Sequence, residues 1–335
     1  MVSSPRPVSK TLASCPSIIW PSDDTSLVGL DVHHFVGVAA EDDVADGIGV
    51  DLVPAVGHTL GDDGDVPWFD KLQHTPTEFS AIHRAQQATD VRLFVDEFTA
   101  GHLPGAQSLD LFYLSLNDTR PDAFNAFMWT ISSLFNKRGV DPSKEIVFYD
   151  EISGMRAARG FWFCEYLGYT VRVLDGGVTA WCNAGYDLTT EVAEPPRVDK
   201  SDTYPQIETH WSADQIALHL TSDEVAILDT RSADELYGRI ARAQRAGSIP
   251  NAVHLEWTEN LQPDGRFKSI ADLEKMYQAV GITSDKQIVC YCQGGYRSAH
   301  SYLALRLIGY PKVSNYIGSW QEWGNRDGLP IWNPE

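Results

Sequence analysis

The chain repeats itself, and this repeat limits the possible folds more than any other feature. Four blocks recur in the same order in two parts of the sequence. Each part alternates short apolar runs with helical patterns, as expected for an α/β unit. The sequence therefore predicts two α/β domains, each a mainly parallel sheet flanked by helices. The matched blocks are residues 101–106 with 247–252, 147–150 with 289–292, 167–169 with 308–310, and Gly176 and Trp181 with Gly318 and Trp323.

The predicted domain boundaries follow from the repeat and from one linker. A proline-rich, charged segment begins at residue 194 and separates the two copies. We expect a first domain over residues 86–195, a linker over 196–206 and a second domain over 207–335. Residues 1–85 form an acidic N-terminal region, which is either a solvated insertion or the source of the first elements of the first domain. Within it, residues 27–31 resemble a buried strand that ends in aspartate.

Composition excludes several classes of partner. The chain has 335 residues, 43% of them hydrophobic, which is enough for two packed domains. Its formal net charge is -20, and no basic stripe is present to bind nucleic acid or an anionic membrane surface. No apolar run is long enough to predict a membrane span. An anionic substrate would therefore need a local cradle of positive charge or amide donors.

The five cysteines do not form a disulfide scaffold, because they are few, odd in number and widely spaced. No cysteine or histidine cluster has the spacing of a zinc site, and the sequence predicts no metal or cofactor. Cys290 and Cys292 are one residue apart on an expected strand, so their side chains should face opposite ways. We expect a reducing, cytoplasmic location.

Cys292 stands where an expected strand gives way to a glycine-bearing loop. A helical pattern of apolar residues then begins at Ala299 and closes at Gly309. Loop amides and the positive end of the helix dipole converge at such a turn, lower the pKa of a thiol and hold an anion beside it. Cys292 could instead be a small core residue, but this position favours a reactive thiolate, whereas Cys290 is expected to be buried and inert.

The residues after Cys292 are the candidate substrate-binding residues. Gly294 and Gly295 allow the loop to curl so that its N–H groups face the sulfur. Arg297 adds positive charge near a helix N-terminus, where a cation is otherwise unfavourable, and Ser298 adds a hydroxyl donor. The full candidate set is Gln293, Gly294, Gly295, Tyr296, Arg297 and Ser298.

An ordered set of motifs resembles the rhodanese family in its tandem two-domain form, and within it the thiosulfate/3-mercaptopyruvate sulfurtransferases. The motifs are Leu228-Asp229-Thr230-Arg231, residues 247–252, Tyr291-Cys292-x-x-Gly295-x-Arg297-Ser298 and Gly318-Ser319-Trp320. We interpret the Asp229 and Arg231 side chains as a structural ion pair.

The resemblance implies two rhodanese-like domains and a division of labour between them. Cys292 would accept sulfur from a small anionic donor, thiosulfate or 3-mercaptopyruvate, as a persulfide. The acceptor would be cyanide or a thiol, including a protein thiol. Asp150 stands where the first copy would carry its cysteine, so the first domain would be catalytically silent and would help to wall the site.

This sequence differs from the tandem relatives in two ways, and so it does not predict which sulfur donor is preferred. Glu235 falls where tandem relatives tend to place a substrate-binding arginine, and Arg239, Arg242 and Arg245 just beyond it could compensate. The loop also matches neither of the familiar types, the doubly basic one or the small one of mercaptopyruvate enzymes.

Two alternative functions are retained. Phosphatases and arsenate reductases of related fold use a Cys/Arg loop on oxyanions, but four residues separate Cys292 from Arg297, which gives a smaller cradle that suits one sulfur atom better. The other alternative is a non-enzymatic sulfur carrier or interaction module built from two rhodanese-like domains.

Overall fold

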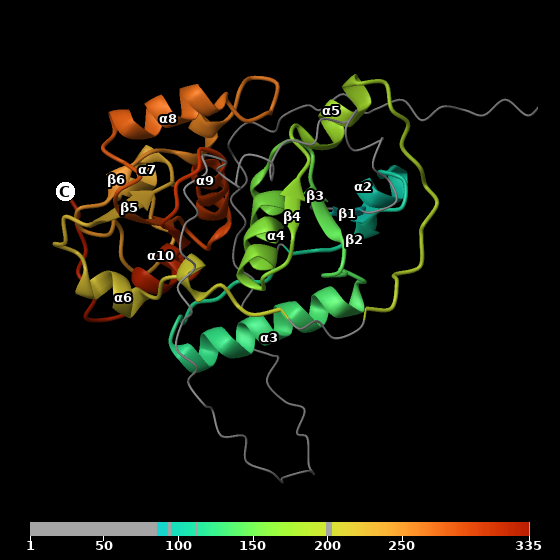
Figure 1. The fold of residues 1–335 in the computed structure, drawn as a ribbon. Helices are drawn as coiled ribbons and strands as arrows, with labels where there is room; N and C mark the ends of the chain where they lie inside the picture. The colour runs from blue at the N-terminus through green and yellow to red at the C-terminus, as the bar shows by residue number, and fades with distance from the viewer. Residues whose placement is uncertain (1–85, 93–94, 112, 199–202, 335) are drawn as a thin grey trace, which may run out of the picture. The chain divides into compact units, whose positions relative to one another are not determined.

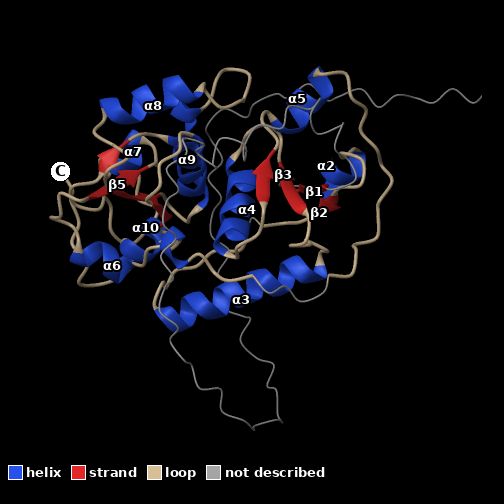
Figure 2. Ribbon diagram, viewed as in Figure 1, coloured by secondary structure: helices blue, strands red, loops and turns tan. Residues whose placement is uncertain are grey.

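A computed structural model of the chain describes residues 86–92, 95–111, 113–198 and 203–334. The acidic N-terminal region of residues 1–85, with its candidate strand at 27–31, lies outside these residues. Within them the predicted fold class is confirmed, because two parallel sheets are each flanked by helices (Figures 1 and 2).

Elements of the first sheet and its surroundings come from residues 86–183. They are β1 (Gln86–Asp90), α2 (Val95–Ala100), β2 (Gln107–Ser108), α3 (Pro121–Lys137), β3 (Glu145–Tyr149), α4 (Met155–Tyr166), β4 (Val171–Val173) and α5 (Gly177–Asn183).

Elements of the second sheet and its surroundings follow the linker. They are η2 (Ile207–Thr209), α6 (Ala213–Leu218), β5 (Val225–Asp229), α7 (Ala233–Leu236), β6 (Val253–His254), η3 (Trp257–Asn260), α8 (Ile270–Ala279), β7 (Gln287–Tyr291), α9 (Tyr296–Leu307), β8 (Val313–Asn315) and α10 (Ser319–Trp323).

The two sheets have the same topology. Their strand orders are β2-β1-β3-β4 and β6-β5-β7-β8, and every pairing within them is parallel. Asp90 lies opposite Tyr149 in the first sheet, and Asp229 lies opposite Tyr291 in the second. The carboxyl ends of the two central strands therefore meet, and the residue after Tyr291 is Cys292. Ligand sites in parallel sheets occur at this edge.

Strand β1 is the first strand of the first sheet, which the sequence alone did not identify. Its residues lack an apolar run, so it has no buried-strand signature. The buried Gln87 side chain instead donates to the carbonyl of Gly139 and accepts from the N–H of Asp141. These bonds satisfy a polar side chain that would otherwise be costly to bury.

The predicted ion pair at the end of β5 is confirmed. Arg231 and Asp229 are both buried, with Nη2 of the arginine 2.6 Å from Oδ2 of the aspartate. The hydroxyl of Tyr291 donates to the same Oδ2 at 2.5 Å, and Arg231 also donates to the carbonyl of Gly247 at 2.9 Å. The pair thus ties β5, β7 and the segment before β6 together behind the Cys292 loop.

The first domain contains the same arrangement of an arginine–aspartate pair with a tyrosine hydroxyl. Arg92 lies 2.6 Å from Asp90, the hydroxyl of Tyr149 donates to Asp90 at 2.9 Å, and Arg92 donates to the carbonyl of Gly101 at 2.6 Å. This copy extends the sequence repeat upstream to β1.

Helices α4 and α9, one from each half of the repeat, lie side by side (Figure 1). A hydrophobic cluster runs from one sheet to the other through them and includes Trp162 and Tyr302. The Arg306 guanidinium binds Glu165 at 2.7 Å, and the hydroxyl of Tyr302 donates to the same carboxylate at 2.7 Å. Continuous packing of this kind holds both loops that precede the helices in fixed positions.

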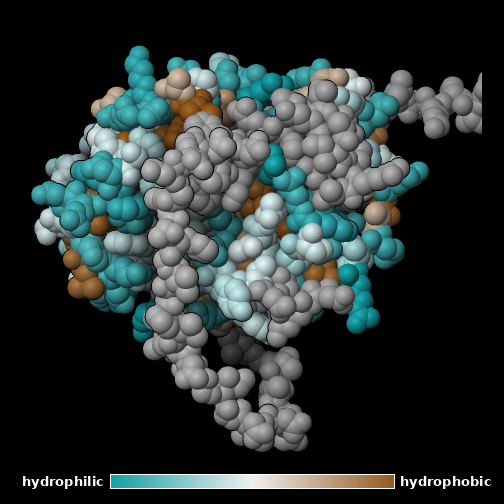
Figure 3. Space-filling model, in the orientation of Figure 1, coloured by the Kyte–Doolittle hydropathy of each residue, from teal (hydrophilic) through white to brown (hydrophobic). Residues whose placement is uncertain are grey.

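The surface in Figure 3 is mostly hydrophilic, with hydrophobic residues in small separate patches. Among the described residues, no helix combines the length and apolar character that crossing a membrane would require.

Candidate active site

Cys292 lies directly after β7 and before the first turn of α9. Gly295 separates the two with a φ of 85°, a left-handed conformation that favours glycine. A Cβ at this position would also lie 2.9 Å from the carbonyl oxygen of Ile317. Helix α9 begins at Tyr296, earlier than the apolar pattern from Ala299 predicted, because its first turn is polar.

Hydrogen-bond donors surround the Cys292 sulfur. The N–H of Gly295 donates to Sγ at 3.1 Å, and the hydroxyls of Ser298 and Ser319 lie 3.6 and 3.9 Å from it. The sulfur is also buried, since Cys292 is only 1% exposed. A thiolate or persulfide here would be held by directed hydrogen bonds and shielded from bulk water.

These neighbouring groups set the pKa of the Cys292 thiol. Burial by itself would raise the pKa of Cys292, but the charge of Arg297, the Ser298 hydroxyl and the N–H groups of Ser298 and Gly294 outweigh it. The pKa therefore lies below its ordinary value. Burial raises the pKa of Cys290, as predicted for an inert strand cysteine.

Alkylation of Cys292 by iodoacetamide is expected to reach half its maximal rate below pH 9, because only the thiolate reacts. In Ser298→Ala the midpoint should rise by about half a pH unit, since one hydrogen bond to the charged form is lost. Peptide mass spectrometry after timed quenching measures the rate at this residue. A midpoint unchanged in Ser298→Ala would exclude the hydroxyl from stabilising the thiolate.

Other loop side chains are held by partners away from the sulfur atom. The Gln293 amide donates to the carbonyl of Arg242 at 3.0 Å, while its own Oε1 is buried and has no hydrogen-bond partner among the described residues. The Tyr296 hydroxyl donates to the carbonyl of Leu111 at 2.5 Å, which joins the loop to the first half of the repeat. Both residues shape the loop from its outer side.

Arg297 is paired with Glu235. Its two terminal nitrogens donate to the carboxylate at 2.6 and 2.9 Å, which uses the guanidinium fork. Glu235 also closes a capping box with Ser232 at the start of α7, so α7 fixes the carboxylate. Burial tends to raise the pKa of Glu235, but Arg297 overrides it and lowers the pKa to about 2. A charged Glu235 thus explains how a cation is stable in the first turn of α9.

The arginines after Glu235 differ in their engagement. Arg239 pairs with Asp234 at 2.7 Å. Arg245 donates to four backbone carbonyls, those of Trp323, Gly324, Arg326 and Leu329, and so serves the fold. Arg242 is half exposed and lies 3.4 Å from Glu235. Arg239 and Arg242 are thus similarly exposed and each pairs with a carboxylate, whereas Arg245 is committed to the backbone.

Replacing Glu235 with glutamine should change stability only above a defined pH. A depressed carboxyl pKa stabilises the fold above the unfolded-state value, near 4.5, and this contribution is lost as pH falls towards 2. Urea unfolding of wild type and Glu235→Gln should therefore differ at pH 6 by roughly 3 kcal/mol, and by progressively less below pH 4.5. A difference independent of pH would contradict a charged pair with Arg297.

Asp150 occupies the corresponding place in the first half of the repeat. Its carboxylate accepts from the N–H groups of Gly154 at 2.9 Å, Arg156 at 3.2 Å and Ala157 at 3.1 Å. Burial and the nearby Glu151 raise its pKa to about 7 despite these bonds. The N–H groups of this loop thus already donate to a side chain of the chain itself and are not free to bind an external anion.

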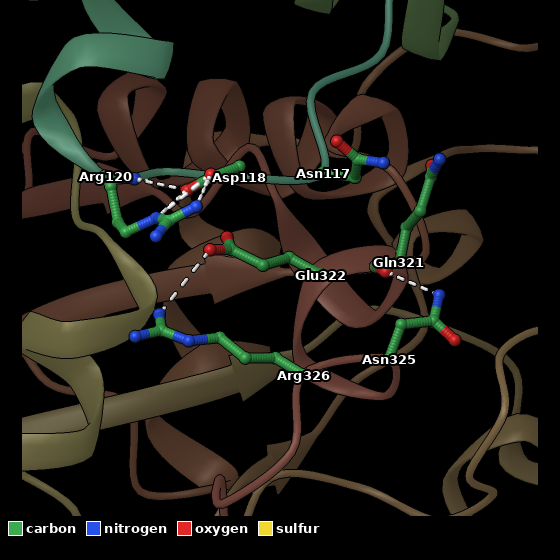
Figure 4. Close-up of a pocket in the computed structure, with 7 residues that line it drawn as sticks. All are labelled: Asn117, Asp118, Arg120, Gln321, Glu322, Asn325 and Arg326. Atoms are coloured by element: carbon green, nitrogen blue, oxygen red, sulfur yellow. Dashed lines mark hydrogen bonds and ion pairs between the residues drawn. The ribbon is translucent and has the colours of Figure 1, made fainter.

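A polar cavity of about 450 Å³ lies next to the Cys292 loop (Figure 4). The N–H of Gln321, in its lining, donates to the carbonyl of Gln293 at 2.8 Å. Arg120 pairs with Asp118, and Arg326 lies 3.7 Å from Glu322, so the charges in the cavity balance. The lining residues are Asn117, Asp118, Arg120, Gln321, Glu322, Asn325 and Arg326.

Several residues around the sulfur could not be identified individually from the sequence. Ser319 lies within a quoted motif, and its φ of 52° turns its hydroxyl into position to accept from the N–H of Cys292 at 3.0 Å. The Ser298 hydroxyl lies 2.7 Å from Asn315 Oδ1 and 3.6 Å from Cys292 Sγ, so these two acceptors compete for its single proton, and a charged thiolate is the stronger acceptor. Arg159, from α4, donates to the carbonyl of Gly294 at 2.7 Å, and no sequence pattern points to this contact.

Comparison with protein-family models decides the family. The rhodanese-like domain model matches residues 75–184 and again residues 212–326. The chain belongs to the rhodanese family. Both halves of the repeat are rhodanese-like domains, and the fold and motif order described above are those of tandem rhodanese proteins.

Curated relatives cover most of the chain. The sulfur carrier protein TtuD of Thermus thermophilus is 36% identical over 256 residues, which span 71% of this chain and 89% of the relative. The thiosulfate sulfurtransferase of Azotobacter vinelandii is 33% identical over 235 residues, spanning 70% of this rhodanese and 86% of the relative.

Among solved structures, wild-type EanB matches with a TM-score of 0.66 at 23% identity over 74% of this rhodanese. The anaerobic ergothioneine biosynthesis enzyme of Chlorobium limicola, bound to trimethyl histidine, matches with a TM-score of 0.64. The matches span 63% and 64% of those chains, less than two thirds of their length. At this identity the likeness is one of fold alone.

Proposed function

We propose that this rhodanese is a sulfurtransferase that moves sulfane sulfur from thiosulfate or 3-mercaptopyruvate to cyanide or a thiol through a Cys292 persulfide. One observation carries the proposal: the Cys292 sulfur lies against the N–H of Gly295 and the Ser298 hydroxyl, with its pKa lowered. Relatives named thiosulfate sulfurtransferase, at 33% and 30% identity, support the same reaction.

In the first half-reaction the Cys292 thiolate attacks the sulfur to be transferred, which is the outer sulfur of thiosulfate or the thiol sulfur of 3-mercaptopyruvate. With thiosulfate, a bond forms between the two sulfurs, the donor S–S bond breaks and its electron pair leaves with sulfite. With 3-mercaptopyruvate, the same S–S bond forms, the C–S bond breaks and its electron pair leaves on carbon as an enolate, which takes up a proton to become pyruvate. The product in either case is a persulfide on Cys292.

In the second half-reaction an acceptor attacks the outer sulfur of the persulfide. Cyanide leaves as thiocyanate, whereas a thiol acceptor becomes a persulfide itself, and the electron pair of the broken S–S bond returns to Cys292. The terminal persulfide sulfur is anionic between the two steps. The substrate-binding role that we propose for Gln293 to Ser298 is to surround this sulfur with N–H and hydroxyl donors and to add the charge of Arg297.

The two domains would divide the work. We propose residues 207–335 as the catalytic domain, 196–206 as the linker and 86–195 as a silent domain. Asp150 cannot carry a persulfide, and its carboxylate already fills the amide cradle of the silent loop. A reactive thiolate functions in a reducing compartment, so we also propose a cytoplasmic location.

A carrier role is the second candidate, because one relative is named a sulfur carrier protein. A carrier would form the same persulfide but release it only to a protein thiol or similar protein group. Phosphatase or arsenate-reductase activity is less compatible with the site, because Glu235 already occupies the guanidinium fork of Arg297.

A steady-state assay separates these functions. Purified protein is supplied with thiosulfate or 3-mercaptopyruvate as donor and with cyanide as acceptor, and thiocyanate is measured. Turnover with either donor supports the sulfurtransferase and identifies the donor. Persulfide formation without turnover on cyanide would indicate a carrier. Hydrolysis of an aryl phosphate that depends on Cys292 would overturn the proposal.

A further inference from the structure

Helices α4 and α9 each send one side chain, from the same position in the helix, to the loop that precedes the other helix. Arg159 is the fifth residue of α4 and His300 the fifth residue of α9. Arg159 donates through Nη1 to the carbonyl of Gly294 in the Cys292 loop at 2.7 Å. His300 contacts the carbonyl of Ser153 in the Asp150 loop at 2.8 Å, and its Nε2 must donate because a carbonyl oxygen only accepts. Each domain therefore holds the loop of the other.

Arg159 acts on the peptide unit that binds the sulfur. The Gly294 carbonyl and the Gly295 N–H belong to one planar trans peptide, so they point in opposite directions. Arg159 binds the carbonyl at one end, and the N–H at the other donates to Cys292 Sγ at 3.1 Å. A hydrogen bond to the carbonyl both fixes the orientation of the N–H and polarises it as a donor.

The guanidinium is also an unusual buried charge. Arg159 is 0% exposed and donates to the carbonyls of Gly294 and Leu114, and its Nε has no partner in the part of the chain that the structure describes. Its guanidinium carbon lies 3.8 Å from the centre of the Tyr296 ring, and no carboxylate among the described residues forms an ion pair with it. Burying a cation in this way costs stability, and negative charge on Cys292 is what would compensate it.

Gly295 leaves the space that Arg159 uses. A Cβ there would stand 2.9 Å from Nη1 of Arg159, so any larger residue would push the guanidinium from the Gly294 carbonyl. The loop glycine and the arginine of the other domain therefore fit each other.

We propose that Arg159, a residue of the silent domain, positions the Gly294–Gly295 peptide for sulfur transfer and offsets the negative charge of the Cys292 thiolate and persulfide. This extends the proposed function, since it assigns the silent domain a part in the chemistry. Arg159 is a positioning residue, because it contacts the loop backbone and not the reacting sulfur in the hydrogen bonds described.

The test is the pH dependence of Cys292 alkylation by iodoacetamide in Arg159→Met, with His300→Phe as the matched control. Both variants remove the equivalent contact across the same helix pair, but only Arg159 contacts the Cys292 loop. The alkylation midpoint should rise by about one pH unit in Arg159→Met. It should stay unchanged in His300→Phe. Equal midpoints in wild type and both variants would overturn the proposal.

Arg159→Lys covers the case in which Arg159→Met does not fold, because lysine keeps the charge and a donor on a side chain of similar reach. Its midpoint should rise by less than that of Arg159→Met, by about half a unit. In the sulfur-transfer assay, Arg159→Met should lower kcat about tenfold or more and leave KM for the donor nearly unchanged. An unchanged midpoint in Arg159→Lys, together with unchanged kcat, would also overturn the proposal.

Alkylation needs no sulfur donor, so the two proposals can fail separately. A wild-type protein that transfers no sulfur but shows the Arg159-dependent midpoint would refute the sulfurtransferase and keep the positioning role.

Discussion

Cys292→Ser is expected to abolish sulfur transfer, lowering kcat on the order of 10³-fold or more. A serine hydroxyl is not ionised at neutral pH and cannot hold a second sulfur as a persulfide. The substitution replaces one small buried side chain with another at a site that already offers hydrogen-bond donors, so the fold should persist. Thiocyanate formation and far-ultraviolet circular dichroism measure the two effects.

Cys290→Ala is the matched control for this loss. Cys290 lies two residues earlier in β7, fully buried, with its pKa raised by burial. The substitution should lower thermal stability slightly and leave kcat within about twofold of wild type. If Cys290→Ala lost activity and Cys292→Ser kept it, the assignment of the chemistry to Cys292 would be wrong.

Asp229→Asn is expected to destabilise the protein by about 3–5 kcal/mol, because it leaves the buried Arg231 charge without its partner. The hydrogen bond from the Tyr291 hydroxyl would also weaken, since it would lose a charged acceptor. Urea unfolding followed by tryptophan fluorescence measures the change. A loss below about 1 kcal/mol would show that the pair does little for the fold.

A double variant isolates the cause of this loss. Adding Arg231→Met to Asp229→Asn removes the uncompensated charge, so it should recover part of the stability. Asp90→Asn tests the equivalent pair in the first domain, where the Arg92 side chain is 8% exposed against 1% for Arg231. The loss there should be smaller because water can reach the orphaned guanidinium.

Sequence patterns were sufficient for the parts of the fold that rest on apolar runs and turn residues. Strand β5 is an apolar run that ends in a carboxylate, Val225 to Asp229, and α8 is followed within two residues by Gly281, whose φ of 80° is the left-handed turn that ends many helices. Strand β1 was missed because it lacks an apolar run, and the partners of its buried Gln87 side chain lie about 50 residues away in sequence. No local pattern carries such information.

The candidate site divides in the same way. The Cys292 turn could be predicted because its strand, glycines and helix are contiguous in sequence. The partner of Arg297 could not, because Glu235 is brought to it by the pairing of β5 with β7. Arg159 could not be predicted either. It reaches the loop from the other domain, and it binds a backbone carbonyl, a group that every residue has.

Intact mass spectrometry of the reduced protein, after incubation with thiosulfate or 3-mercaptopyruvate and removal of the excess, tests persulfide chemistry most directly. Wild type should gain one sulfur atom from at least one donor, peptide mapping should place it on Cys292, and added cyanide should remove it. Cys292→Ser should gain none. A folded, reduced wild-type protein that gains no sulfur from either donor, or gains it equally in Cys292→Ser, would contradict sulfur transfer through Cys292.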